Sequence, residues 1–298
     1  MTGATSEVLL LALIPAVFWG FAPIFDKRGM AAGGGPVQAS LVVVIVELLI
    51  YWTIITLFYR GSAFAGLTLE VFLVFVFAGV VGTALGRITI FVGVDRVGAS
   101  LNSAILSTRP LFATGIALVF LDEPVGPVTG VGIVVLVSGL SLLAVSKGGD
   151  LEGWSVWDLL WPLAAAAAFA VANVSRRYGM LETPISPLEA VTINETAGLI
   201  ALVAYVVARG RTDVLSMPRE TYVYFTGSGL LTSVAMVSLM AALGLEAGRI
   251  AIVDPLVATA PLFTIVFAAL LLRDLERVTR GVVAGAGLIV VGAALITM

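Results

Sequence analysis

Three ionisable residues lie deep inside long apolar stretches of this sequence: Glu47, Arg87 and Arg109. A charged group at the centre of a membrane helix costs at least about 2.5–3.5 kcal/mol, so each of the three needs a partner or a ligand. Two guanidiniums offer forked donors that match a carboxylate or a phosphate, and a carboxylate can balance their charge or take up a proton. The same three groups could equally satisfy one another as a buried structural lock.

All three residues fall at a similar depth. Counted from the nearest connections and at 1.5 Å per residue, each lies roughly 15–18 Å inside its segment, near the middle of a bilayer. Arg109 is the most central candidate. Other polar or aromatic side chains, on the first, fourth and seventh segments, complete the predicted substrate-binding set, which is Trp19, Glu47, Arg87, Asn102, Arg109, Asn194 and Glu195. For Asp254, an acidic residue favoured by a helix N-terminus is the preferred interpretation.

The elements that must carry these residues follow from composition. Of 298 residues, 60% are hydrophobic and only 12% charged, against about 25% charged in a typical soluble domain. The backbone of a membrane-spanning segment has to bond to itself, so each long apolar segment is predicted to be a helix. The ten predicted spans are 8–26, 37–59, 69–94, 100–121, 128–146, 157–175, 188–208, 220–244, 250–272 and 281–298.

The same composition excludes several classes of function. Cysteine and histidine are absent, which removes thiolate chemistry and the commonest general base and metal ligand. An intramembrane Ser–His protease or a His-dependent metalloprotease is therefore disfavoured. The net charge of −3 and the lack of a basic block exclude nucleic acid as a partner. Neither a metal nor a cofactor is expected.

A five-segment unit is written twice. Asp26-Lys27-Arg28-Gly29-Met30 returns as Arg176-Arg177-Tyr178-Gly179-Met180, and Pro110-Leu111-Phe112 returns as Pro261-Leu262-Phe263. Acidic residues follow the two proline motifs, Asp122-Glu123 and Asp274, and paired glycines close each unit. Because each unit has an odd number of spans, the two copies are predicted to lie upside down relative to one another.

These motifs resemble the drug/metabolite transporter superfamily, in the branch built from two EamA domains, with the two copies at 1–148 and 149–298. The resemblance rests on Trp19-Gly20, Gly79…Gly82-Thr83-Ala84, Pro110, Asp122-Glu123, Gly132…Gly139, Pro261, Asp274 and Gly285…Gly292. It implies a multi-pass protein of the plasma membrane that moves small metabolites through a central cavity. Arg109 departs from the family, which usually has a small or apolar residue there.

The resulting hypothesis is a secondary transporter that works by alternating access on an anionic or zwitterionic, amino-acid-like metabolite. The alternative is a proton-coupled exporter of cationic or lipophilic drugs that uses Glu47 or Glu195 as its proton site. The expected partners are the substrate, membrane lipid and a coupling proton or ion. Both a monomer and a homodimer fit the sequence, since Gly126-x-x-x-Gly130 and Gly281-x-x-x-Gly285 suit close helix packing within one chain or between two.

The orientation in the membrane is predicted in two conflicting ways. Connections on the side of the N-terminus are assigned four basic residues, including Arg176 and Arg177, and those on the other side ten. The positive-inside rule then places both termini outside the cell. The resembling family mostly keeps both termini in the cytoplasm.

Overall fold

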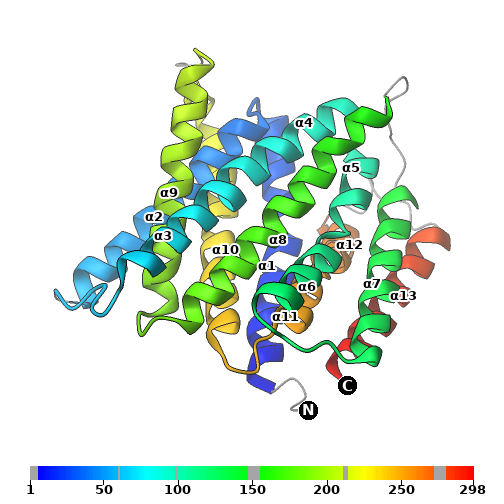
Figure 1. Ribbon diagram of the computed structural model, residues 1–298. Coiled ribbons are helices and arrows are strands. Elements are labelled where there is room, and N and C mark those ends of the chain that lie inside the picture. Colours follow the sequence, from blue (N-terminus) through cyan, green and yellow to red (C-terminus); the bar gives the residue numbers. More distant parts are fainter. Residues whose placement is uncertain (1–5, 60, 98, 147–154, 211–213, 272–279) are drawn as a thin grey trace.

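The computed structural model describes residues 6–59, 61–97, 99–146, 155–210, 214–271 and 280–298 (Figure 1). These residues form helices and contain no strand. The elements in chain order are α1 (Ser6–Ala31), α2 (Pro36–Phe58), α3 (Leu69–Ala78), the π-helix η1 (Gly79–Gly86), α4 (Arg87–Val97), α5 (Ala99–Leu106), α6 (Arg109–Phe120), α7 (Pro127–Ser146), the 3₁₀ turn η2 (Val156–Leu159), α8 (Leu160–Leu181), α9 (Pro187–Ala208), α10 (Arg219–Gly244), α11 (Ile250–Val257), α12 (Ala260–Leu271) and α13 (Arg280–Thr297).

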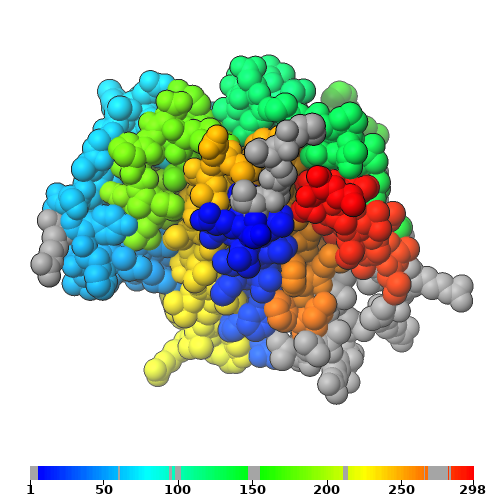
Figure 2. Space-filling view, turned by 90° about the horizontal axis from the view of Figure 1, so that it is seen from below, coloured from blue at the N-terminus to red at the C-terminus, as the bar shows by residue number. Residues whose placement is uncertain are grey.

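Ten apolar helical segments cross the molecule within the described residues. Eight are long enough to span a bilayer alone, and the shorter segments Ile250–Thr264 and Val283–Thr297 complete the set. The predicted fold of ten membrane helices in two five-helix repeats is therefore confirmed. Helix α1 begins and α13 ends at one face of the bundle, which we call the termini face (Figure 1). On that face, α1 lies between α10 and α12 (Figure 2).

The fourth and ninth spans are each divided in two, where the sequence predicts one continuous helix. The fourth span breaks at Ser107–Thr108, between α5 and α6, and the ninth breaks at Ala258–Thr259, between α11 and α12. The breaks are related by the same offset of 151 as the two proline motifs. Pro110 and Pro261 lie just after these breaks. A proline removes a backbone hydrogen-bond donor and its ring clashes with the preceding turn, so each one interrupts its helix.

The sixth span is longer than predicted. Helix α8 continues to Leu181 instead of ending at residue 175. Arg176 and Arg177, assigned to a connection from the sequence, are therefore buried in the bundle, at 4% and 3% exposure. Of the four basic residues that the sequence assigns to this side, Arg249 is left in a described connection and Arg60 lies outside the described residues, so the charge count still favours termini outside the cell. The orientation stays a prediction.

Glycine pairs set the crossing of α7 and α13. A Cβ built on Gly139 would lie 2.8 Å from the carbonyl oxygen of Gly285, and one on Gly132 would lie 2.9 Å from that of Gly292. Any larger side chain would push the two helices apart. Gly130, by contrast, faces open space. The predicted close packing is thus found within the chain at Gly285, and Gly130 takes no part in it.

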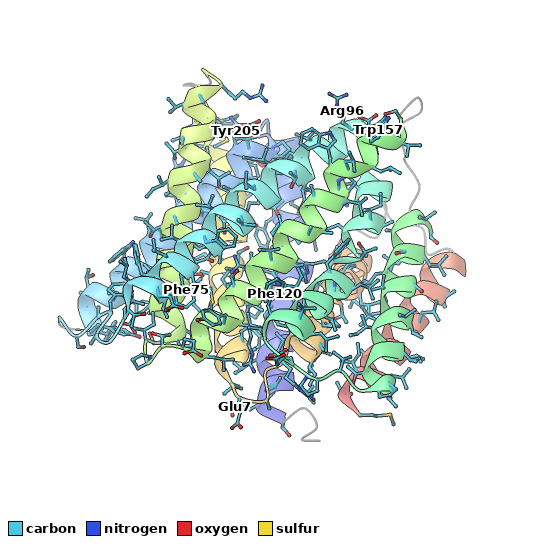
Figure 3. The ribbon with its side chains drawn as sticks, in the orientation of Figure 1. Glu7, Phe75, Arg96, Phe120, Trp157 and Tyr205 are labelled. Atoms are coloured by element: carbon cyan, nitrogen blue, oxygen red, sulfur yellow. The ribbon has the colours of Figure 1, made fainter. Side chains whose placement is uncertain are left out.

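Side chains at the two ends of the bundle differ from those between them (Figure 3). Arg96 and Trp157 lie at the face opposite Glu7, which is at the termini face. Trp157 is 79% exposed, as suits an aromatic residue at the membrane–water interface. Phe75, in the middle of α3, is fully buried against Gly179 of α8. The three side chains named at the two ends of the bundle are thus exposed, and Phe75 between them belongs to its interior.

Candidate functional site

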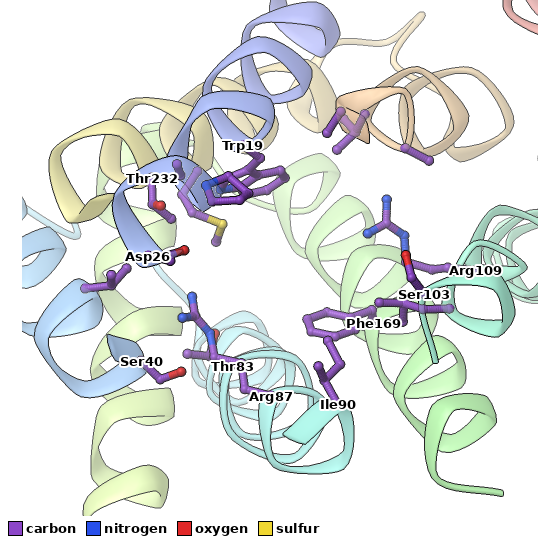
Figure 4. Close-up of a pocket in the computed structure, with 18 of the residues that line it drawn as sticks. Trp19, Asp26, Ser40, Thr83, Arg87, Ile90, Ser103, Arg109, Phe169 and Thr232 are labelled. Carbon is purple, nitrogen blue, oxygen red and sulfur yellow. The ribbon is translucent and has the colours of Figure 1, made fainter. Parts of the chain in front are cut away.

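A cavity of about 550 Å³ lies between the two repeats (Figure 4). Met30 at the end of α1, Pro36 at the start of α2 and the exposed Ser103 of α5 line it near the face opposite the termini. Its deeper part is lined from α6, α8 and α9 by Arg109, Arg176 and Glu195. The cavity therefore opens away from the termini face and ends near the middle of the bundle.

Repeat-related residues from the first and sixth spans face each other across this cavity. Trp19 and Phe169, separated by the repeat offset of 150, supply an aromatic side chain from each copy (Figure 4). Asp26 and Arg176 are related by the same offset and also line the cavity, with opposite charges. The two repeats thus place an aromatic residue at one pair of equivalent positions and charges of opposite sign at the other pair.

The π-helix η1 positions Arg87 and Thr83. A Cβ on Gly79 would lie 1.9 Å from the carbonyl oxygen of Asn194, so α9 crosses η1 in close contact at a glycine. A π-helix adds a residue per turn, and such turns are common at functional sites. Both Thr83 and the residue that follows η1, Arg87, line the cavity (Figure 4). Arg87 makes no hydrogen bond or ion pair with any described residue.

Arg109 is paired, and its partner is Asp254 rather than Glu47. Its Nε lies 3.1 Å from Oδ2 of Asp254, which is only 1% exposed. The other carboxylate oxygen, Oδ1, accepts a hydrogen bond from Nδ2 of Asn173 at 2.5 Å. Asp254 is the fifth residue of α11, so the interpretation of it as an acid at a helix N-terminus is wrong.

The same polar chain continues across the floor of the cavity. Arg176 donates to Oδ1 of Asn173 at 2.8 Å and to Oδ1 of Asn194 at 3.1 Å. Oε1 of Glu195 accepts from Nδ2 of Asn194 at 2.8 Å and from Oγ1 of Thr83 at 2.9 Å. Oε2 of Glu195 has no partner among the described residues. The network joins both repeats and leaves one buried acceptor unused.

Glu47 lies behind the cavity wall. It is fully buried in α2, and neither of its carboxylate oxygens has a hydrogen-bond partner among the described residues. The charged groups that act on it are Glu195, Arg87 and Arg176. One turn further along α2, the hydroxyl of Tyr51 donates to the carbonyl of Ser233 in α10 at 2.9 Å. Glu47 is thus an unsatisfied acid close to the cavity but not in its lining.

The predicted set is only partly brought together. Trp19, Arg87, Arg109 and Glu195 line the cavity. Glu47, Asn102 and Asn194 are buried outside its lining, and Asn102 packs against Gly93, where a Cβ would lie 2.0 Å from its Oδ1.

Sequence reasoning missed Asp26, Asn173 and Arg176 as members of the site. The repeat offset could have identified Asp26 and Arg176, since both belong to the duplicated motif.

Comparisons with known proteins agree with this architecture. The model of the EamA-like transporter family matches residues 7–145 and again residues 156–298. A WAT1-related chloroplastic protein of Arabidopsis thaliana is 34% identical over 89 residues, which cover 29% of this chain and 21% of that protein. The chain thus matches about a fifth of that relative's length. A solved crystal structure matches 99% of this chain and 97% of its own at a TM-score of 0.77 and 14% identity, which shows a shared fold.

Proposed function

This chain belongs to the EamA-like transporter family, and we propose that it is a secondary carrier for a zwitterionic, amino-acid-like metabolite. As a member of this family it is a multi-pass integral membrane protein of the drug/metabolite transporter superfamily that moves small substrates. The finer proposal adds three things: a substrate with both charges, alternating access between the two faces, and the plasma membrane as its location.

One observation carries the choice of substrate. Asp26 and Arg87 face the same cavity from α1 and α4, and no ion pair joins them (Figure 4). Oδ1 of Asp26 is buried without a hydrogen-bond partner among the described residues, and its polar neighbours are Ser228 and Arg87. An acid and a guanidinium that form no ion pair with each other suit an ammonium and a carboxylate held in one molecule. Trp19 and Phe169 offer apolar surface for the remainder.

A count of buried charges supports a zwitterion over a simple anion. Around the cavity lie four acids, Asp26, Glu47, Glu195 and Asp254, and three arginines, Arg87, Arg109 and Arg176. With every group ionised, one carboxylate is left over. Uncompensated charge in a low-dielectric interior is expensive. A zwitterionic ligand brings one charge of each sign and leaves this balance unchanged, whereas an anion would leave a second carboxylate uncompensated.

The second candidate is a proton-coupled exporter of cationic or lipophilic compounds. The unpartnered oxygens of Glu47 and Glu195 favour it, since either acid could hold the coupling proton. Under this alternative the excess carboxylate binds a cation alone, and Arg87 contributes little. The two candidates therefore differ in what they require of Arg87.

Thermal stabilisation of the purified protein separates the candidates. The probes are L-phenylalanine, its deaminated analogue 3-phenylpropionate and its decarboxylated analogue phenethylamine. We expect L-phenylalanine to stabilise the protein. Arg87→Gln should raise the Kd for L-phenylalanine by about 10- to 150-fold, the range for the loss of one hydrogen bond to a charged group. In Asp26→Asn the preference shifts from the amino acid to 3-phenylpropionate.

The matched control is Arg96→Gln, which removes an arginine from a surface ion pair with Asp158 and is expected to leave binding unchanged. Stabilisation by phenethylamine alone, unaltered by Arg87→Gln, would overturn the carrier of zwitterions and support the cation exporter.

A further inference from the structure

The two broken spans meet on one side of the cavity only. Helix α6, the second half of the fourth span, packs against α11, the first half of the ninth. The repeat relates α6 to α12 and α11 to α5. Among the described residues, α5 and α12 do not pack against each other as α6 and α11 do. The bundle is therefore closed between the cavity and the termini face, where α6 meets α11, and open at the other face.

Helices α6 and α11 are tied at both ends. At the cavity end, Arg109 at the start of α6 pairs with Asp254 of α11 at 3.1 Å. At the termini face, Glu123 lies just beyond α6, and its Oε2 accepts from the backbone N–H of Ile250, the first residue of α11, at 2.7 Å. Both acids are buried, at 1% and 7% exposure.

Arg177 reinforces the contact between Glu123 and α11 at the termini face. Its Nε lies 2.9 Å from Oε1 of Glu123. Its other nitrogens donate to the carbonyl of Leu243 at the end of α10 and to those of Leu245 and Glu246 in the connection that leads to α11. The guanidinium is 3% exposed and joins α8, the connection after α6 and the connection before α11. Breaking this tie would leave buried charges unpaired, so it holds the closed side firmly.

On the open side of the cavity, the residues that correspond to Arg109 and Asp254 carry no charge. The repeat offset of 151 relates Asp254 to Ser103 and Arg109 to Ala260. Ser103 and Ala260 both line the cavity, and they cannot form an ion pair. The duplicated architecture is therefore chemically asymmetric at this repeat-related pair of positions, charged on one side of the cavity and uncharged on the other.

We propose that the ion pairs Arg109–Asp254 and Arg177–Glu123 form the gate on the termini face, which must separate before the cavity can open there. The gate rests on the proposed alternating-access function, and it assigns Arg109 to the gate rather than to the substrate. Because the closed state gains the Arg109–Asp254 ion pair, which the repeat-related Ala260 and Ser103 cannot form, the resting carrier favours an opening away from the termini. Weakening the gate shifts the population toward the other state.

Cysteine labelling tests the gate directly, since the native chain has no cysteine. One reporter is Ala251→Cys, on α11 between the two ties and 3% exposed. The other is Ser103→Cys, exposed at the open mouth. In lipid nanodiscs, where both faces are accessible, we measure the rate of reaction with a charged methanethiosulfonate reagent. The gate variants are Glu123→Gln and Asp254→Asn, with Arg96→Gln as the control.

The expected result is reciprocal. In each gate variant, labelling at Ala251→Cys rises by about tenfold or more while labelling at Ser103→Cys falls, as a shift between two states requires. The double exchange Arg109→Asp with Asp254→Arg restores the original rates, which a merely misfolded protein would not do. A rise at both reporters, or no change at Ala251→Cys, would overturn the gate.

Failure of the gate and failure of the carrier are distinguishable. If L-phenylalanine still stabilises the protein through Arg87 but labelling is not reciprocal, the carrier stands and the gate is wrong. If labelling is reciprocal but none of the three probes stabilises the protein, the gate stands and the proposed substrate is wrong.

Discussion

Arg87 and Arg177 are both arginines inside membrane helices, and they solve the problem of a buried charge in opposite ways. Arg177 is almost fully buried and donates to one carboxylate and three carbonyls. Arg87 is half-buried, faces the cavity and bonds to no described residue. A charge that its own protein satisfies stabilises the closed side of the bundle, whereas a charge left unsatisfied is available to a ligand.

The acids repeat this contrast. Both oxygens of Glu123 are used, one by Arg177 and one by the N–H of Ile250. Both oxygens of Glu47, and one oxygen each of Asp26 and Glu195, lack a partner among the described residues. The acids with an unused oxygen gather around the cavity, whereas Glu123, with both oxygens used, lies at the termini face. The two regions of one bundle are thus built for binding and for closure.

The largest expected effect is on stability. Arg177→Gln should lower the free energy of unfolding by about 3–5 kcal/mol, since it leaves Glu123 buried without its partner. Arg87→Gln should cost less than about 1 kcal/mol, because it breaks no bond within the described structure. Melting temperatures of the two variants in one detergent check this. Equal losses of stability in the two variants would contradict the proposed difference between Arg177 and Arg87.

The next effect compares two acids. Glu123→Gln should lower stability by about 1–3 kcal/mol, because the amide cannot accept two charge-assisted hydrogen bonds. Glu47→Gln should not lower stability, since neither oxygen of Glu47 has a partner to lose. Denaturant-induced unfolding of both variants, followed by the same fluorescence signal, measures the difference. A marked loss in Glu47→Gln would mean that its carboxylate is already satisfied.

Packing provides a third contrast. Gly139→Ala should destabilise the protein by about 1–3 kcal/mol, since the new methyl group meets the backbone of α13. Gly130→Ala, on the same helix with open space around it, should leave stability unchanged or slightly raised. The difference in melting temperature between these two variants isolates the helix crossing from the general effect of removing a glycine.

The smallest effect is expected at the surface. Arg96 forms an ion pair with Asp158 at 3.6 Å, and its side chain is 61% exposed. Exposed pairs of this kind contribute little to stability. Arg96→Gln should therefore change neither the melting temperature nor the Kd for L-phenylalanine. A loss comparable to that of Arg177→Gln would show that exposure does not separate the two arginines.

Sequence patterns located most of the architecture because the bilayer constrains it so strongly. Spans such as 37–59 and 188–208 agree closely with α2 and α9, since length and hydropathy fix a membrane helix. The sequence pattern places the end of α8 too early, because Arg176 and Arg177 are typical of the polar end of a span. Only the tertiary packing shows that Asn173, Asn194 and Glu123 satisfy them inside the bundle.

The sequence by itself determined the class, the ten helices, the duplication and the candidates Trp19, Arg87, Arg109 and Glu195. These depend on local composition and spacing, which any reader of the chain can count. The tertiary structure decided which charges are paired, since Arg109 and Asp254 are 145 residues apart and meet only through the inverted repeat. It also decided which face is closed. Two nearly equivalent halves can pack in two ways, and the contacts between α6 and α11, rather than any local pattern, select one of them.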